Sequence, residues 1–119
     1  MDVNLRVGNG SVDTGNNYAW RSESNGTADT TGTSTNLIQL FSSSSAINYN
    51  VEASIVNIAS SFKPVFVNIA STTATVAGAP GKRIVTGVWG NSSNVIDTIS
   101  LIASTGNLGA AQLIVLGHN

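Results

Sequence analysis

Short apolar runs that alternate with polar, glycine-bearing connections constrain the fold of this chain more than any other feature. They are clearest in residues 84–117, which read IVTGVWGNSSNVIDTISLIASTGNLGAAQLIVLG. The apolar runs there are residues 84–89, 95–103 and 111–116. The connections between them are typical of turns that join antiparallel strands. We therefore expect three strands in this third of the chain, with everything upstream packed against them.

The same pattern predicts further strands upstream, at residues 3–7, 17–23, 37–41, 48–58 and 65–70. An interruption of the alternation near Val56 favours a β-bulge. Residues 25–35 are polar and rich in Gly and Thr, which predicts a surface loop. Helical periodicity nowhere exceeds one turn, so the expected count is seven or eight strands.

This spacing predicts one all-β domain over residues 1–119, an antiparallel, jelly-roll-like β-sandwich. An immunoglobulin-like sandwich is the second choice. Trp20 and Trp89 are expected to flank the core. The expected core consists of Leu37, Ile38, Leu40, Val51, Ile55, Val65, Val67, Ile69, Ile84, Val88, Ile99, Leu101, Leu113 and Val115.

Charged residues are unusually scarce, at 9% of the chain with a net charge of −1. A neutral polar surface lacks the repulsion that keeps monomers apart, which favours a protein that lives in a permanent assembly, or outside the cell, over a monomer. The basic residues are scattered apart from the pair Lys82–Arg83, so nucleic acid is an unexpected partner. No apolar run approaches the ~20 residues needed to span a bilayer, and no secretory signal is recognisable, so no membrane contact is expected.

No catalytic, cofactor-binding or metal-binding constellation emerges from the sequence. The absence of Cys excludes disulfides, thiolate metal sites and cysteine nucleophiles. Residues 78–83 (GAPGKR) lack the spacing of a phosphate-binding loop and predict a turn. Asp13 only faintly resembles a calcium ligand and is expected to be a solvated loop residue. An enzyme would need Asp97 and the penultimate His118 to meet in one pocket, and a structural role is favoured for Asp97.

The aromatic residues offer one alternative function. Tyr18, Trp20, Trp89 and the nearby Asn91 are candidate ligand or partner contacts, because exposed rings beside amides bind sugars in many β-sandwiches. Burial in the core is the favoured interpretation of these rings. The alternative hypothesis is a carbohydrate-binding module that recognises a host glycan at the tip of a tail fibre.

Two segments together resemble a family of tailed-bacteriophage virion proteins. These are residues 5–20 (LRVGNGSVDTGNNYAW) and residues 87–117, where a strand, a polar turn, a second strand and a "GN" turn precede a final strand. The resemblance implies a jelly-roll-like structural protein without catalytic residues or cofactors, which decorates or cements the capsid or forms a tail appendage. Its implied partners are the major capsid protein or other virion proteins and further copies of itself, most simply as a homotrimer. Its implied location is the virion, after synthesis in the host cytoplasm.

Overall fold

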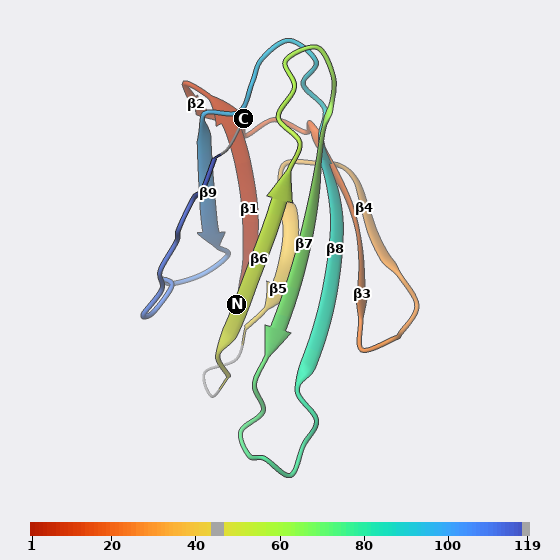
Figure 1. Ribbon diagram of the computed structural model, residues 1–119, viewed down its shortest axis with the longest axis vertical. Helices are drawn as coiled ribbons and strands as arrows, with labels where there is room; N and C mark the ends of the chain where they lie inside the picture. Colours follow the sequence, from red (N-terminus) through yellow and green to blue (C-terminus); the bar gives the residue numbers. More distant parts are fainter. Residues whose placement is uncertain (44–46, 118–119) are drawn as a thin grey trace.

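The protein is a two-layer antiparallel β-sandwich (Figure 1). The computed structural model describes residues 1–43 and 47–117, and this part of the chain contains nine strands and no helix. The molecule measures 48 × 31 × 30 Å, with the strands running along its long axis. The predicted all-β antiparallel sandwich is confirmed, while its jelly-roll character is unconfirmed.

The smaller sheet is built around the first strand. β1 (Asp2–Asn9) pairs with the two-residue β2 (Ser11–Val12), with β5 (Ile38–Ser42) and with β9 (Thr98–Ala103). β9 therefore brings the C-terminal third of the chain beside the N-terminal strand.

The larger sheet has the strand order β4-β3-β8-β7-β6. Its members are β3 (Tyr18–Ser24), β4 (Thr30–Thr35), β6 (Tyr49–Ile55), β7 (Lys63–Ser71) and β8 (Gly81–Trp89). β8 is the central strand, and it pairs along its full length with β7 and over seven residues with β3. Because β6, β7 and β8 are consecutive in the chain, this half of the sheet is a simple meander.

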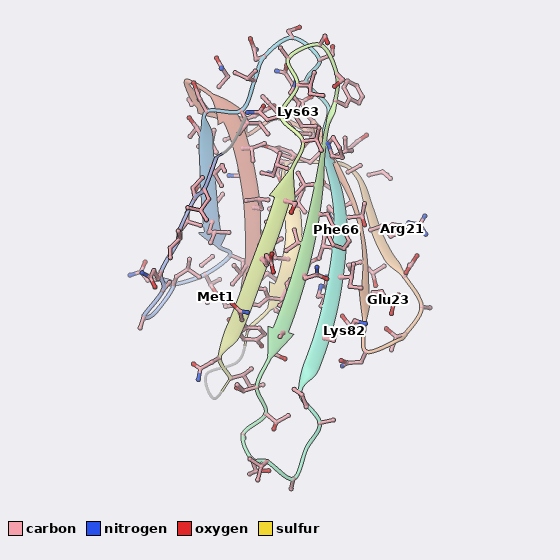
Figure 2. The ribbon with its side chains drawn as sticks, viewed as in Figure 1. Met1, Arg21, Glu23, Lys63, Phe66 and Lys82 are labelled. Carbon is pink, nitrogen blue, oxygen red and sulfur yellow. The ribbon has the colours of Figure 1, made fainter. Side chains whose placement is uncertain are left out.

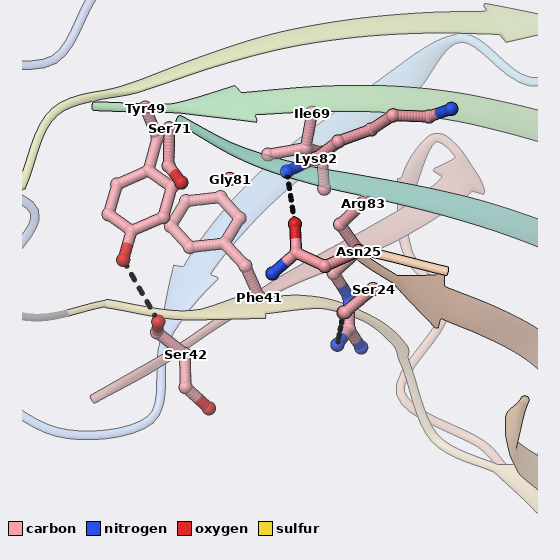
Figure 3. Close-up of a pocket in the computed structure, with 10 residues that line it drawn as sticks. All are labelled: Ser24, Asn25, Phe41, Ser42, Tyr49, Ile69, Ser71, Gly81, Lys82 and Arg83. Atoms are coloured by element: carbon pink, nitrogen blue, oxygen red, sulfur yellow. Dashed lines mark hydrogen bonds between the residues drawn. The ribbon is translucent and has the colours of Figure 1, made fainter. Parts of the chain in front are cut away.

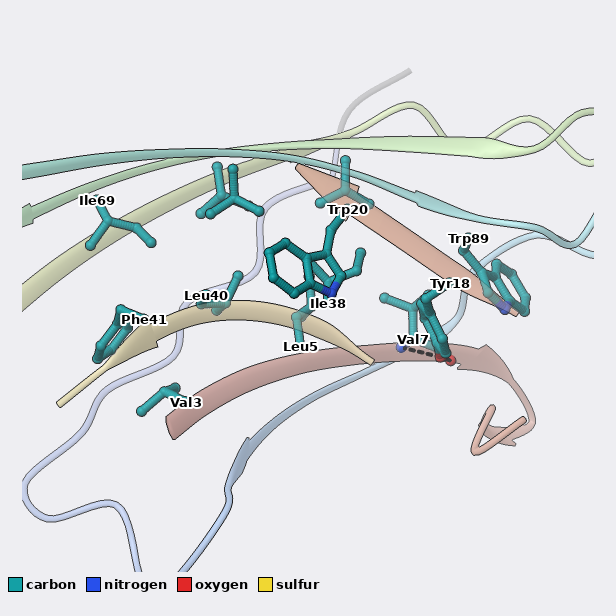
Figure 4. Packing of buried hydrophobic residues seen from close by; sticks show 13 residues of the cluster. Val3, Leu5, Val7, Tyr18, Trp20, Ile38, Leu40, Phe41, Ile69 and Trp89 are labelled. Carbon is teal, nitrogen blue, oxygen red and sulfur yellow. Dashed lines mark hydrogen bonds between the residues drawn. The ribbon is translucent and has the colours of Figure 1, made fainter. Parts of the chain in front are cut away.

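The core lies between the sheets and takes mostly alternate residues from the strands that form it, because alternate side chains of a strand point to the same face (Figure 4). Its members come from β1, β3, β5, β7 and β8, and only β5 gives two consecutive residues, Leu40 and Phe41. They are Val3, Leu5, Val7, Tyr18, Trp20, Ile38, Leu40, Phe41, Val65, Val67, Ile69, Val85 and Trp89. The predicted Ile38, Leu40, Val65, Val67 and Ile69 are confirmed. β1 was expected to form an early strand, and it contributes three core residues that the prediction left out.

The residues of β8 that were predicted to point into the core are wrong by one position. Val85 is fully buried, whereas the expected core residues Ile84 and Val88 are only half-buried. Register explains the difference, because Val85 pairs with the buried Val67, and Trp89 pairs with the buried Lys63 and Tyr18. In a strand, a shift of one residue exchanges the two faces.

The polar tract 25–35 is also not wholly a loop. Thr30–Thr35 forms the edge strand β4, after a tight turn in which Asn25 and Gly26 have positive φ angles of 53° and 76°. Asn-Gly favours such turns, and Thr suits a polar edge strand.

The opposite error occurs at residues 111–116, which were predicted to form the last strand but belong to no strand and are exposed. His118 lies outside the described residues.

Candidate functional site

The three aromatic residues singled out from the sequence are buried, and they lie in the core. Tyr18, Trp20 and Trp89 expose 2%, 9% and 1% of their surface, so their rings offer no platform to a ligand in solvent. The indole of Trp20 covers Gly32 on β4, where a β-carbon would lie 2.5 Å from the ring nitrogen. Asn91 is half-buried, and its Oδ1 accepts hydrogen bonds from the backbone nitrogens of Ser93 and Asn94. Each of the four side chains thus has a structural task.

A hydrogen-bond network connects two of these rings, Tyr18 and Trp89, at the end of the sandwich where β8 finishes. The indole nitrogen of Trp89 donates to Asp13 Oδ2 at 2.8 Å. The hydroxyl of Tyr18 lies 2.8 Å from the carbonyl oxygens of Val7 and Asp13 and accepts a bond from the Val7 nitrogen at 3.1 Å (Figure 4). Burial raises the pKa of the Tyr18 phenol. The network fixes the connection between β2 and β3 against β1 and β8.

Asp13 organises this connection and is not simply a solvated loop residue. Its carboxylate accepts bonds from Trp89, from the Asn17 amide at 2.9 Å and from the Gly15 nitrogen at 2.8 Å. Partial burial opposes ionisation, but these donors together hold the pKa of Asp13 below its usual value. The charged carboxylate is therefore the form that the fold prefers.

Lys63 is the least expected member of this end of the molecule, because it is fully buried at the start of β7. Its Nζ donates to the carbonyl oxygens of Asn91 at 2.6 Å, Ser61 at 2.7 Å and Ala59 at 3.3 Å. The ammonium also lies 5.6 Å from the centroid of the Trp89 ring, within cation–π range. Figure 2 shows Lys63 where the β6–β7 and β8–β9 connections meet. One buried cation thus ties both connections to the core.

The two connections that Lys63 holds also bond to each other. The Asn57 side chain donates to the Ile96 carbonyl at 2.9 Å and accepts from the Ile96 nitrogen at 2.7 Å. The same two connections expose large apolar side chains, each between 41% and 57% accessible. We call these residues the end patch: Val56, Ile58, Phe62 and Val95. Exposed apolar groups on loops that are held in place are a common feature of protein–protein contact sites.

The end patch was missed in the sequence, where residues 48–58 were expected to form one strand. β6 stops at Ile55, and Val56 and Ile58 continue the apolar pattern into the connection. Lys63 gave no signal of burial, because its partners are backbone carbonyls, which every residue possesses.

A polar pocket of about 250 Å³ lies at the opposite end of the sandwich (Figure 3). Phe41 and Tyr49 stack in it with ring centroids 4.2 Å apart, and the Tyr49 hydroxyl donates to the Ser42 carbonyl. The Arg83 guanidinium donates to the Ser24 hydroxyl at 3.2 Å, and burial lowers the pKa of Arg83. The pocket lining contains neither a carboxylate nor an imidazole, and its ionisable side chains are Tyr49, Lys82 and Arg83.

Catalytic or metal-binding groups do not gather elsewhere in the described part of the chain. Asp97 is exposed and accepts bonds from the Gly10 nitrogen and the Thr98 hydroxyl, which hold its pKa below the usual value and fasten the β1–β2 turn. Across residues 1–43 and 47–117, no three His, Cys, Asp or Glu residues are placed to hold a metal ion. Within the same residues no helix could cross a membrane.

Comparison with known proteins adds no family assignment. No protein-family model matches the chain, and neither the curated proteins nor the solved structures give a significant match. The resemblance to tailed-bacteriophage virion proteins therefore supports only a proposal.

Proposed function

We propose that this chain is a structural, non-enzymatic virion protein that decorates or cements the capsid of a tailed bacteriophage, as a jelly-roll-like homotrimer. The observation that carries the proposal is the end patch, a set of exposed apolar side chains on two connections that a buried lysine holds in place. The resemblance of residues 5–20 and 87–117 to phage virion proteins supplies the biological setting.

The end patch suits docking because its loops are already ordered. Lys63 and the Asn57–Ile96 clasp fix the two connections, so little conformational entropy is lost when a partner covers them. Burial of apolar surface contributes about 25 cal/mol for each Å² removed from water. Several copies bound to one capsid lattice would convert modest single contacts into stable attachment, because linked binding events reinforce one another.

The alternative function, glycan recognition by a tail-fibre tip, loses its main support. It needs exposed aromatic rings, yet Trp20 and Trp89 are both in the core. In the polar pocket at the opposite end, Phe41 and Tyr49 stack on each other, so each ring covers one face of its neighbour.

Phe62→Lys tests the docking role of the end patch. The variant places a charge in the proposed contact, so we expect its affinity for expanded heads of the parent phage to fall by at least about tenfold in co-sedimentation assays. Phe66→Lys is the matched control, because Phe66 is exposed to a similar degree on the outer face of β7, away from the end patch (Figure 2). Equal binding by both variants, or no binding by the unmodified protein, would contradict the proposal.

A further inference from the structure

Residues 111–116 (AQLIVL) have the sequence of a buried strand but lie on the surface. Leu113, Ile114, Val115 and Leu116 expose between 55% and 88% of their surface. In an extended segment consecutive residues point to opposite sides, so these four place apolar groups on both faces. Strands of this kind are usually covered on both sides. The segment therefore requires a neighbouring strand and cover above and below it.

The outer edge of β9 offers a matching site. β9 pairs with β1 along one edge, and in the described part of the chain no strand pairs with its other edge. Ile99 and Leu101 share the face of Val7 and Leu5 and pack on the core, while Ile102 lies on the opposite face beside Asn4. All six residues of β9 are only half-buried. β9 thus carries incompletely covered apolar groups on both faces, as the segment does.

The β9 edge fits the segment better than the β6 edge of the larger sheet. β6 carries Asn50, Glu52 and Ser54 on its exposed face, so a strand added there would place one of its apolar faces beside a carboxylate. Residues 98–117, in contrast, contain no charged side chain. Pairing the segment with β9 therefore buries no charged side chain of either strand and places none opposite the segment on β9.

The segment does not occupy this edge within its own chain, because residues 111–117 belong to no strand. Leu108 packs against the core just before it, and residues 109–117 are all exposed. A second copy of the chain supplies both an unpaired segment and an open β9 edge.

We propose that residues 111–116 of one copy add as a strand to the outer edge of β9 in a second copy. Main-chain hydrogen bonds would supply the pairing, and the apolar groups of the two strands would cover one another. Exchange in a closed ring of copies would leave neither an open β9 edge nor an exposed segment. The surface involved is separate from the end patch, so self-association and capsid docking can be tested independently.

Disulfide trapping tests the exchange directly, because the natural chain contains no Cys. Chains with Ser100→Cys are mixed with isotope-labelled chains that carry Leu113→Cys, Ile114→Cys or Val115→Cys, so that alternative registers are covered. We expect at least one mixed disulfide between labelled and unlabelled chains, since bridging needs Cα atoms within about 7 Å. Two results would overturn the proposal. One is the absence of any mixed disulfide. The other is a disulfide that closes within a single chain when that chain carries both substitutions.

A charge substitution supplies the second measurement. Val115→Lys should weaken self-association of the full chain by at least about tenfold in sedimentation analysis, because a charge would enter the paired strand. Val76→Lys is the matched control, since Val76 is a fully exposed valine in the β7–β8 connection. A monomeric natural chain, or equal weakening by both variants, would contradict the strand exchange.

Discussion

At the scale of single residues, Lys63 has the largest effect on how the two connections are held. Its ammonium satisfies three backbone carbonyls and lies over the Trp89 ring, at a position with no solvent exposure. A buried charge is tolerated only when it is paired or fully hydrogen-bonded, and here backbone oxygens replace an acidic partner. The end patch depends on this arrangement, because the carbonyls belong to the two connections that form it.

Lys63→Met keeps most of the side-chain volume but removes all three donors. We expect a loss of about 2–4 kcal/mol in the free energy of unfolding, because three partly buried hydrogen bonds between the ammonium and backbone carbonyls would be lost. Urea denaturation measures the loss, and Lys82→Met is the control, since Lys82 is exposed and should tolerate the change within about 0.5 kcal/mol. Equal stability of the two variants would show that the Lys63 bonds do not hold the connections.

Asp13 gives the fold a defined pH dependence. Its pKa is lower in the folded protein than in the unfolded chain, where the ordinary value is about 3.9. The stabilisation is therefore present above about pH 4 and is lost as the pH falls through the lower, folded value. We expect Asp13→Asn to lower the thermal midpoint at pH 7. Near pH 2 the difference in thermal midpoint between the variant and the natural chain should be smaller. A difference that stays constant with pH would mean that the carboxylate charge contributes nothing.

At the scale of elements, β8 determines how closely the two sheets approach. Gly87 lies two residues before its end, in register with Trp20 and Val65, and a β-carbon there would sit 2.6 Å from Ile38 Cδ1 on the facing sheet. Ile38 is fully buried, and its Cγ1 and Cγ2 would also lie within 3.2 Å of that β-carbon, so the whole side chain would have to shift in a closely packed core. The absence of a side chain at Gly87 therefore allows β5 to pack on the larger sheet.

Gly87→Ala should destabilise the protein by about 1–3 kcal/mol, the usual cost of overpacking a core. Gly109→Ala is the matched control, because nothing lies within 4 Å of the position that a β-carbon would take there. Calorimetry on both variants measures the difference. A Gly87 variant as stable as the Gly109 variant would indicate that the sheets can separate at little cost.

The sequence predicted most strands because their residues alternate, and the errors have identifiable physical causes. The face of β8 was misassigned, since Val85, Gly87 and Trp89 include a glycine, which weakens the alternation. β4 was missed because an edge strand of Thr and Ser buries little, although Asn25–Gly26 is a hairpin signal. Residues 111–116 have a strand pattern, but pattern alone does not reveal whether a partner strand is present.

The candidate site was harder to predict from the sequence than the fold. Tyr18, Trp20 and Trp89 stood out as aromatic residues, and the structure places them in the core. The end patch depends on where β6 stops and on which carbonyls surround Lys63, and both are consequences of tertiary packing. Local patterns of residue type contain neither piece of information.

At the scale of the whole molecule, the composition of the surface indicates how the protein makes contacts. Charged residues form 9% of the chain, and only one ion pair, Arg21–Asp29, joins side chains within the described residues. Apolar groups are exposed on the loops at one end and on the segment after β9. Contacts made through such surfaces depend on shape and buried apolar area and should respond weakly to salt.

The most direct test of the proposed function is a cryo-EM density map of the intact particle of the phage that encodes this chain. We expect the sandwich on the outside of the head, as rings of copies, with Val56, Ile58, Phe62 and Val95 facing the capsid shell. A particle without this chain, or one in which the end patch faces solvent, would contradict that function.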